Sequence, residues 1–160
     1  MLRKRGEPLV ILPETGRLAA AALSLYPAQT AKARLARTVL RRALQWRLPL
    51  PLERVALPVD STAAFSVFLR TQAGTKNFPR LAILCGNART AGRRHILLLF
   101  GENGEPAAVV KAGLGLAARE LIERERAFLA AAGPVENIPG LKGEFRDDRC
   151  AALALEFLEG

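Results

Sequence analysis

The stretch Ala107-Ala-Val-Val-Lys-Ala112 predicts a short β-strand that carries one lysine among small apolar residues. Side chains alternate between the two faces of a strand, so Ala107, Val109 and Lys111 share one face. An ammonium group on such a face needs an acceptor, because burying an unpaired charge costs several kcal/mol. Lys111 is therefore the first position in the sequence that suggests a site.

A candidate partner lies on the helix that the sequence predicts next, over residues 116–132. Apolar residues recur along this helix at three- and four-residue spacings and form one stripe: Ala118, Leu121, Ile122, Phe128, Leu129 and Ala132. Glu125 falls at the centre of the stripe, whereas the other charged residues around it project elsewhere. Either charge alone would be a solvated side chain, but Lys111 and Glu125 together predict one ion pair.

Strand and turn signals surround this pair. Short apolar runs predict strands at residues 80–84, 95–100, 107–112, 141–145 and 151–157. Gly101-Glu-Asn-Gly104 has the composition of a hairpin turn. Short connections favour antiparallel pairing, since a parallel pair needs a crossover. We therefore expect an α+β fold with a five-stranded antiparallel sheet, covered by the 116–132 helix.

The first half of the chain has a different character. Helices are predicted at residues 17–25, 31–47 and 62–69, and strands at residues 8–12 and 54–59. Thr30 is the expected N-cap of the second helix. The polar run Gln72–Asn77 marks the expected boundary between a mostly helical accessory segment, residues 1–76, and a second unit, residues 77–160.

Composition narrows the classes of protein. The chain has 160 residues, half of them apolar, which is enough for a packed core. Two cysteines, Cys85 and Cys150, exclude a disulfide-rich scaffold and a cysteine-only zinc site. The single histidine, His95, leaves Ser-His or Cys-His catalysis dependent on one residue. No apolar run is long enough for a transmembrane helix. The segment after the basic start contains Pro8 and Pro13, so it is a poor hydrophobic region for a signal peptide. We expect a cytoplasmic protein with reduced cysteines.

The net charge of +9 suggests anionic partners. The helix expected over residues 31–47 is amphipathic and rich in arginine, as helices at membrane surfaces are. A basic module that binds nucleic acid or a membrane surface is therefore one alternative. A solvated face on an ordinarily packed helix is the other. One Trp and one Tyr leave few platforms for base stacking.

The second half resembles a known family. A hairpin, a strand ending in Val-Val-Lys, a helix with an inward glutamate, and two strands ending in Leu153-Ala-Leu-Glu-Phe-Leu-Glu-Gly160 follow the order of a protein-kinase-like amino-terminal lobe. The pattern is most similar to the aminoglycoside phosphotransferase family, over about residues 79–160. The resemblance implies that Lys111 binds the phosphates of ATP and that Glu125 holds the lysine in place.

The resemblance also implies an adenine site. Val109 would lie over the adenine ring, and Leu155 would form the back of the pocket. The stretch from Leu153 to Gly160 resembles the last strand and hinge of the family, which implies that the backbone of Glu156 and Leu158 contacts the edge of the base.

The loop expected to bind phosphate departs from the family pattern. Its two glycines, Gly86 and Gly92, are six residues apart, which matches neither Gly-x-Gly-x-x-Gly nor a Walker A loop. Backbone N–H groups of such a loop can still bind phosphate. The candidate contacts are Gly86, Asn87 and Thr90. Positive charge would come from Arg89, Arg93 and Arg94. A solvated basic hairpin is the alternative.

The family's catalytic loop, of His-Gly-Asp type, belongs to a second lobe that we do not find in the sequence. His95 is followed by Ile, and Asp147-Asp148 is expected to form a turn. We therefore expect a piece of a phosphotransferase, with Mg²⁺ ligands and the phosphate acceptor bound by the missing lobe. Antibiotic, sugar, choline-like and protein acceptors all remain open. A catalytically degenerate regulatory domain is a further alternative.

Overall fold

The computed structural model describes residues 1–4, 6–14, 16–26, 28–86, 90–133 and 136–158. The strands are β1 (Leu2–Lys4), β2 (Glu7–Ile11), β3 (Leu81–Cys85), β4 (Arg94–Phe100), β5 (Pro106–Leu114), β6 (Leu141–Arg146) and β7 (Cys150–Leu155). The helices are α1 (Gly16–Ala22), α2 (Ala31–Gln45), α3 (Ala64–Ala73) and α4 (Leu116–Ala132), with a short 3-10 helix, η1 (Leu23–Leu25), directly after α1.

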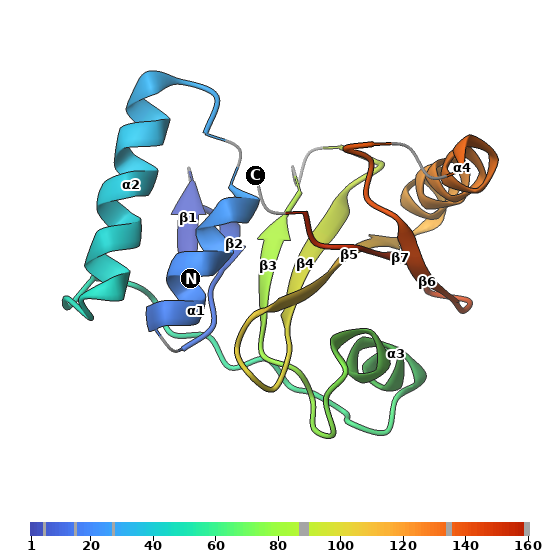
Figure 1. Cartoon of the computed structure of the whole chain (residues 1–160), viewed down its shortest axis with the longest axis horizontal. Coiled ribbons are helices and arrows are strands. Elements are labelled where there is room, and N and C mark those ends of the chain that lie inside the picture. Colours follow the sequence, from blue (N-terminus) through green and yellow to red (C-terminus); the bar gives the residue numbers. More distant parts are fainter. Residues whose placement is uncertain (5, 15, 27, 87–89, 134–135, 159–160) are drawn as a thin grey trace.

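The strands form one sheet in the order β1-β2-β3-β4-β5-β7-β6, with every pair antiparallel (Figure 1). The predicted antiparallel α+β fold is confirmed, but the expected number of five strands is wrong. Val10 and Ile11 of β2 pair with Leu84 and Ile83 of β3. The first segment thereby covers a sheet edge, whose unpaired backbone groups would otherwise be open to other chains.

The strand expected at residues 54–59 is also wrong. Residues 48–60 contain no helix or strand and are mostly exposed. Pro49, Pro51 and Pro58 lie in this segment, and proline cannot donate a hydrogen bond to a strand ladder. The predicted helix at residues 31–47 is confirmed as α2, and the Thr30 side chain accepts a hydrogen bond from the N–H of Ala33 at 3.1 Å.

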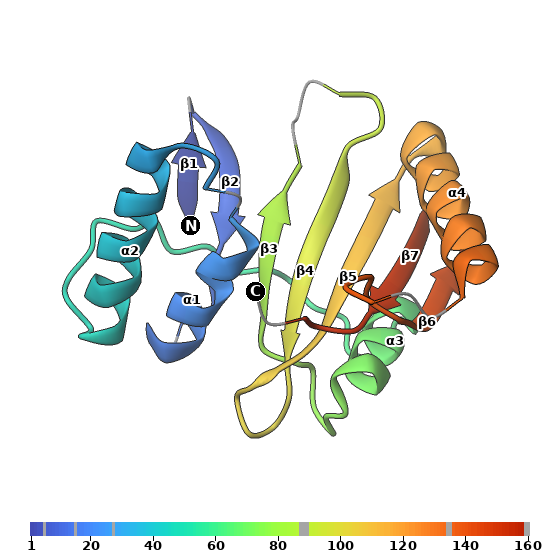
Figure 2. The same ribbon diagram turned by 45° about the horizontal axis from the view of Figure 1, so that its top comes forward.

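Helices cover both faces of the sheet, so the expectation of a single covering helix is wrong (Figure 2). Leu69 and Ala73 of α3 pack on one face, whereas α1 and α4 pack on the opposite face. Strand β4 explains why two layers are needed. Its last four residues, Leu97 to Phe100, are all at most 6% exposed, so apolar side chains point to both faces and both need cover.

The first segment and the second half share this core. Leu18 and Ala22 of α1 pack with Ala82, Leu98 and Phe100 of the sheet. The expected boundary at residues 72–77 lies between the end of α3 and the start of β3. The division into two units there stays a prediction.

Candidate functional site

Lys111 and Glu125 form an ion pair, as the sequence predicts. Lys111 lies on β5, and its Nζ donates a hydrogen bond to Oε1 of Glu125 on α4. A third residue joins them, because Nη1 of Arg94 on β4 lies 3.2 Å from the other carboxylate oxygen, Oε2. Two cations from neighbouring strands therefore share one carboxylate from the covering helix.

The sheet register brings these cations together. Ile96 of β4 pairs with Lys111 of β5, and Arg94 pairs with Gly113. Alternation along β4 puts Arg94 and Ile96 on the same face as Lys111. The sequence predicted Arg94 as a source of positive charge in the loop, but not as a partner of Glu125. Arg94 lies two residues before Ile96, the residue that pairs with Lys111, and this spacing was the signal that could have placed Arg94 on the face of Lys111.

Gly113 sets the position of α4. A Cβ atom there would lie 2.7 Å from the backbone C and O of Ala118. Only glycine allows the first turn of α4 to approach β5 so closely. Gly115, with φ of 81°, then turns the chain into the helix. Glu125 follows Ala118 by two helical turns and so lies over the sheet above Lys111.

The buried face of α4 is narrower than the predicted stripe. Ala118 and Ile122 are buried, and Leu129 packs against the same cluster. Leu121 and Phe128, by contrast, are 37% and 61% exposed. The predicted stripe is therefore wrong at these positions and at the exposed Ala132. Ala118, Ile122, Glu125 and Leu129 form the face that meets the sheet, so the sequence placed Glu125 correctly for a partly wrong reason.

The site has more positive than negative charge. The Glu125 side chain is 21% exposed, Lys111 is 28% exposed and Arg94 is 42% exposed. One carboxylate for two cations leaves a net charge of +1 at a place that solvent still reaches. Such a group can hold an anion with charge-assisted hydrogen bonds, which are stronger than neutral ones.

The residues expected at the adenine ring lie on the same face of the sheet. Val109 pairs with Leu155 across β5 and β7. Leu155 is 2% exposed and packs in the cluster with Ile122 under α4. Val109 is half-buried and packs against the cluster that contains Leu18 of α1. Helix α1 therefore borders the side of the sheet where the resemblance puts the base.

The segment after β7 crosses in front of the sheet toward α1 (Figure 2). The backbone N–H of Glu156 donates to the carbonyl of Gly140 at 2.9 Å, and its Oε2 accepts from the N–H of Gly140 at 3.2 Å. Phe157 packs against the cluster that contains Leu18, whereas Leu158 is 48% exposed. Both expected hinge residues thus lie in the segment directly after β7, and Phe157 between them packs against the same cluster as Val109.

The described part of the glycine-bearing loop contacts α4, the helix that carries Glu125. The N–H of Gly86 donates to the carbonyl of Arg94 at 3.1 Å, so this donor is already used within the hairpin. The carbonyl of Thr90 accepts from the N–H of Arg93 at 3.1 Å. A Cβ at Gly92 would lie 2.5 Å from Cδ1 of Leu121, so the loop contacts α4. Asn87 and Arg89 lie outside the described residues.

The single histidine and the two cysteines take no part in the ion pairs of Lys111, Glu125 and Arg94. Burial, aided by Arg93, lowers the pKa of His95. Burial raises the pKa of Cys85, and burial with Asp147 nearby raises the pKa of Cys150 to about 11. Oδ1 of Asp147 accepts from the N–H groups of Arg149 and Cys150, which confirms the expected turn. Within the described ranges, no three His, Cys, Asp or Glu side chains group as metal ligands.

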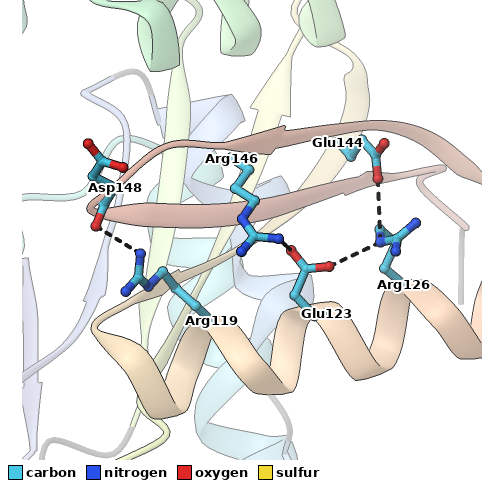
Figure 3. Close-up of polar contacts among 6 residues, drawn as sticks. All are labelled: Arg119, Glu123, Arg126, Glu144, Arg146 and Asp148. Atoms are coloured by element: carbon cyan, nitrogen blue, oxygen red, sulfur yellow. Dashed lines mark hydrogen bonds and ion pairs between the residues drawn. The ribbon is translucent and has the colours of Figure 1, made fainter.

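A second group of charges joins α4 to the hairpin of β6 and β7 (Figure 3). It contains Arg119, Glu123, Arg126, Glu144, Arg146 and Asp148. The Glu123 carboxylate lies 3.2 Å from both Arg126 and Arg146. The sequence analysis missed this network, although Arg126 lies three residues after Glu123 on the helix. Glu123 and Glu144 pair with Arg126 and Arg146, whereas Arg119 donates to the backbone carbonyl of Asp148 at 2.8 Å, so these contacts hold α4 against the hairpin.

Comparison with protein-family models finds no family that matches the chain, and no curated protein sequence matches it. In the part of the chain that the structure describes, no helix has the length and apolar character needed to cross a bilayer. The case for a function therefore depends on the geometry at Lys111, Glu125 and Arg94.

Proposed function

We propose that the chain contributes the nucleotide-binding lobe of an ATP-dependent phosphotransferase similar to the aminoglycoside phosphotransferases. The observation that carries the proposal is the ion pair between Lys111 of β5 and Glu125 of α4. Kinase-like enzymes present an ammonium group to the nucleotide phosphates in this way, with a strand lysine held by a helix glutamate.

The charges at the pair support a phosphate ligand. Arg94 and Lys111 face one carboxylate, and both are partly exposed. A phosphate group would add the negative charge that this set lacks, and would bond both cations. Because Glu125 is held by α4 on one side and by the two cations on the other, the Lys111 ammonium has a defined position before a ligand binds.

The apolar side chain of Val109, which is half-buried, supports a base. Val109 lies on the same face of the sheet as Lys111 and pairs with the buried Leu155, and residues 156–158 follow directly after β7. The backbone of Glu156 and Leu158 would bond the base. Bound ATP would supply the phosphoryl group that the whole enzyme transfers to a small molecule.

The proposal gives this chain only part of the reaction. In the family that it resembles, the general base, the Mg²⁺ ligands and the acceptor site belong to a second lobe. We therefore expect this chain to bind ATP weakly by itself and to transfer no phosphate.

Titration of the ¹⁵N-labelled chain with ATP and with adenosine, followed by amide NMR shifts, tests the proposal. ATP should shift the amides around Arg94 and Lys111 as well as those around Val109 and Leu158, whereas adenosine should shift only the second set. Lys111→Met should remove the phosphate-dependent shifts. The matched control is Lys142→Met on β6, whose Nζ donates to the carbonyl of Ala107 at 3.0 Å.

Two results would contradict the proposal. One is an ATP titration whose shifts are confined to other basic surfaces, such as α2. The other is an unchanged set of shifts in Lys111→Met.

A further inference from the structure

Helix α2 carries apolar side chains on its outer face. Leu35 and Val39 are 67% and 60% exposed, and Trp46, the C-cap residue directly after α2, is 72% exposed. Spacings of four and seven residues put all three on one side of the helix. The helix lies at one end of the molecule, farther out than α1 (Figures 1 and 2). These residues therefore form a stripe, the α2 stripe, that no part of the described chain buries.

A different side of α2 attaches it to the protein. Leu44 is buried and packs with Ala19, Ala20 and Leu23, and Leu40 lies against the same cluster. The apolar residues of α2 thus divide into two groups, one packed on α1 and one in solvent. A solvated polar face on a packed helix does not describe this surface, because the outward side contains three large apolar residues.

Positive charge surrounds the α2 stripe. The helix contains five cations and no acidic residue: Lys32, Arg34, Arg37, Arg41 and Arg42. Within the described residues, none of these five is in an ion pair. Lys32 lies in the first turn, where the helix dipole disfavours a cation. Residues 1–60 contain eleven Lys and Arg against four Asp and Glu, which accounts for +7 of the net charge of +9.

We propose that α2 binds the surface of an anionic lipid bilayer. Leu35, Val39 and Trp46 enter the headgroup region, and the flanking cations lie against lipid phosphates. Interfacial helices combine these two features, an apolar stripe and a basic flank. Trp is also the side chain enriched at the boundary between lipid and water.

Nucleic acid fits this surface less well. Phosphates of a duplex would pair with the cations of α2, but contacts to the backbone would leave the α2 stripe in water. A bilayer uses both the charge and the apolar area. The inference does not depend on the proposed function, because α2 shares no residue with the Lys111 site.

Trp46 gives a direct test, because it is the only tryptophan in the chain. The chain is titrated with vesicles of phosphatidylcholine containing about a quarter phosphatidylserine, and Trp fluorescence is recorded. We expect a blue shift on these vesicles. The apparent affinity should fall at least about tenfold on pure phosphatidylcholine, and similarly at high salt, because salt screens the charges.

Variants test the apolar residues and the cations of this surface separately. Leu35→Asn with Val39→Asn should abolish the blue shift. The matched control is Leu116→Asn with Phe128→Asn on α4, two residues that are 68% and 61% exposed, and it should leave the shift intact. Arg34→Gln with Arg41→Gln should weaken binding about tenfold while keeping the fold, because both side chains are exposed and in no ion pair. Circular dichroism checks that each variant folds.

Four outcomes would overturn the inference. The first two are no shift on anionic vesicles, and an equal shift on neutral ones. The third is a shift that grows with protein concentration in the absence of vesicles, which would mean that a second copy covers the α2 stripe. The fourth is displacement of the chain from anionic vesicles by duplex DNA at physiological salt, which would make nucleic acid the preferred partner.

Discussion

Lys111 and Glu125 form an ion pair that joins β5, an inner strand of the sheet, to α4, the helix that covers it. Arg94 approaches the second oxygen of the same carboxylate at 3.2 Å. Because both cations depend on one carboxylate, Glu125 is the residue that holds the group together. Loss of Glu125 leaves two like charges on neighbouring strands, whereas loss of Lys111 leaves a remaining pair.

This asymmetry predicts an order of stabilities. Glu125→Gln should lower the free energy of unfolding by about 2 kcal/mol, because it leaves Lys111 and Arg94 without a counter-charge. Lys111→Met should lower it by less than about 1 kcal/mol, because Met keeps the apolar stem and Arg94 still pairs with Glu125. Urea unfolding measures both, with the exposed Glu120→Gln on α4 as control. A larger loss in Lys111→Met than in Glu125→Gln would contradict the account of this site.

Gly113→Ala tests the close approach of α4 to β5. The new Cβ would lie 2.7 Å from backbone atoms of Ala118, so the first turn of α4 must move. We expect a loss of about 1–3 kcal/mol in the free energy of unfolding, the range for overpacked sites. Gly101→Ala is the matched control, because its Cβ would lie 3.2 Å from Oδ1 of Asn103 and no closer than 3.6 Å to any backbone atom. Equal melting temperatures for the two variants would show that α4 does not depend on Gly113.

Hydrogen exchange tests whether the two halves unfold together. Ala20 and Ala22 of α1 are buried, and Ala22 packs in one cluster with Leu98 of β4. Because that cluster belongs to both halves, the slowest amides of α1 and of β4 should open with the same free energy. A much lower opening free energy in α1 would support a separable accessory segment ending near residue 76.

Cys150 predicts a loss of stability in alkali. Burial, with Asp147 adding to it, raises the thiol pKa to about 11 in the folded protein, whereas an unfolded thiol ionises near 9. The unfolded state therefore loses its proton first, and the free energy of unfolding falls as pH rises from 9 to 11. A shift of two pH units corresponds to at most about 3 kcal/mol. Urea unfolding across this pH range should show a smaller fall in Cys150→Ala, and equal falls would contradict the raised pKa.

The second half could be predicted from sequence because its signals are local. The lysine among small residues at 107–112 and the glutamate at position 125 both stand out against apolar neighbours. Glycines at the hairpin turn and before α4 mark where the elements end. These signals gave the antiparallel pairing, the helix limits 116–132 and the partners of the ion pair.

The rest depends on contacts that are distant in sequence. The pairing of β2 with β3 joins residues about seventy positions apart, and no local pattern indicates it. The side of α2 that packs on α1 could not be told from the α2 stripe, because both contain apolar residues at helical spacing. The run Ile96–Phe100 was a usable signal that was missed, since continuous apolar sequence in a strand indicates burial on both faces.

The most direct test of the central claim is chemical labelling of Lys111 by an acyl phosphate of ATP. A lysine amine near the terminal phosphate attacks the acyl carbon, keeps the acyl group and releases ATP. The chain has five lysines to compare: Lys4, Lys32, Lys76, Lys111 and Lys142. We predict that Lys111 is the lysine that excess ATP protects, as measured by peptide mass spectrometry, while labelling of Lys32 and Lys142 is unchanged. Labelling of Lys111 that is no faster than that of Lys142 and insensitive to ATP would contradict a nucleotide site at the Lys111–Glu125 pair.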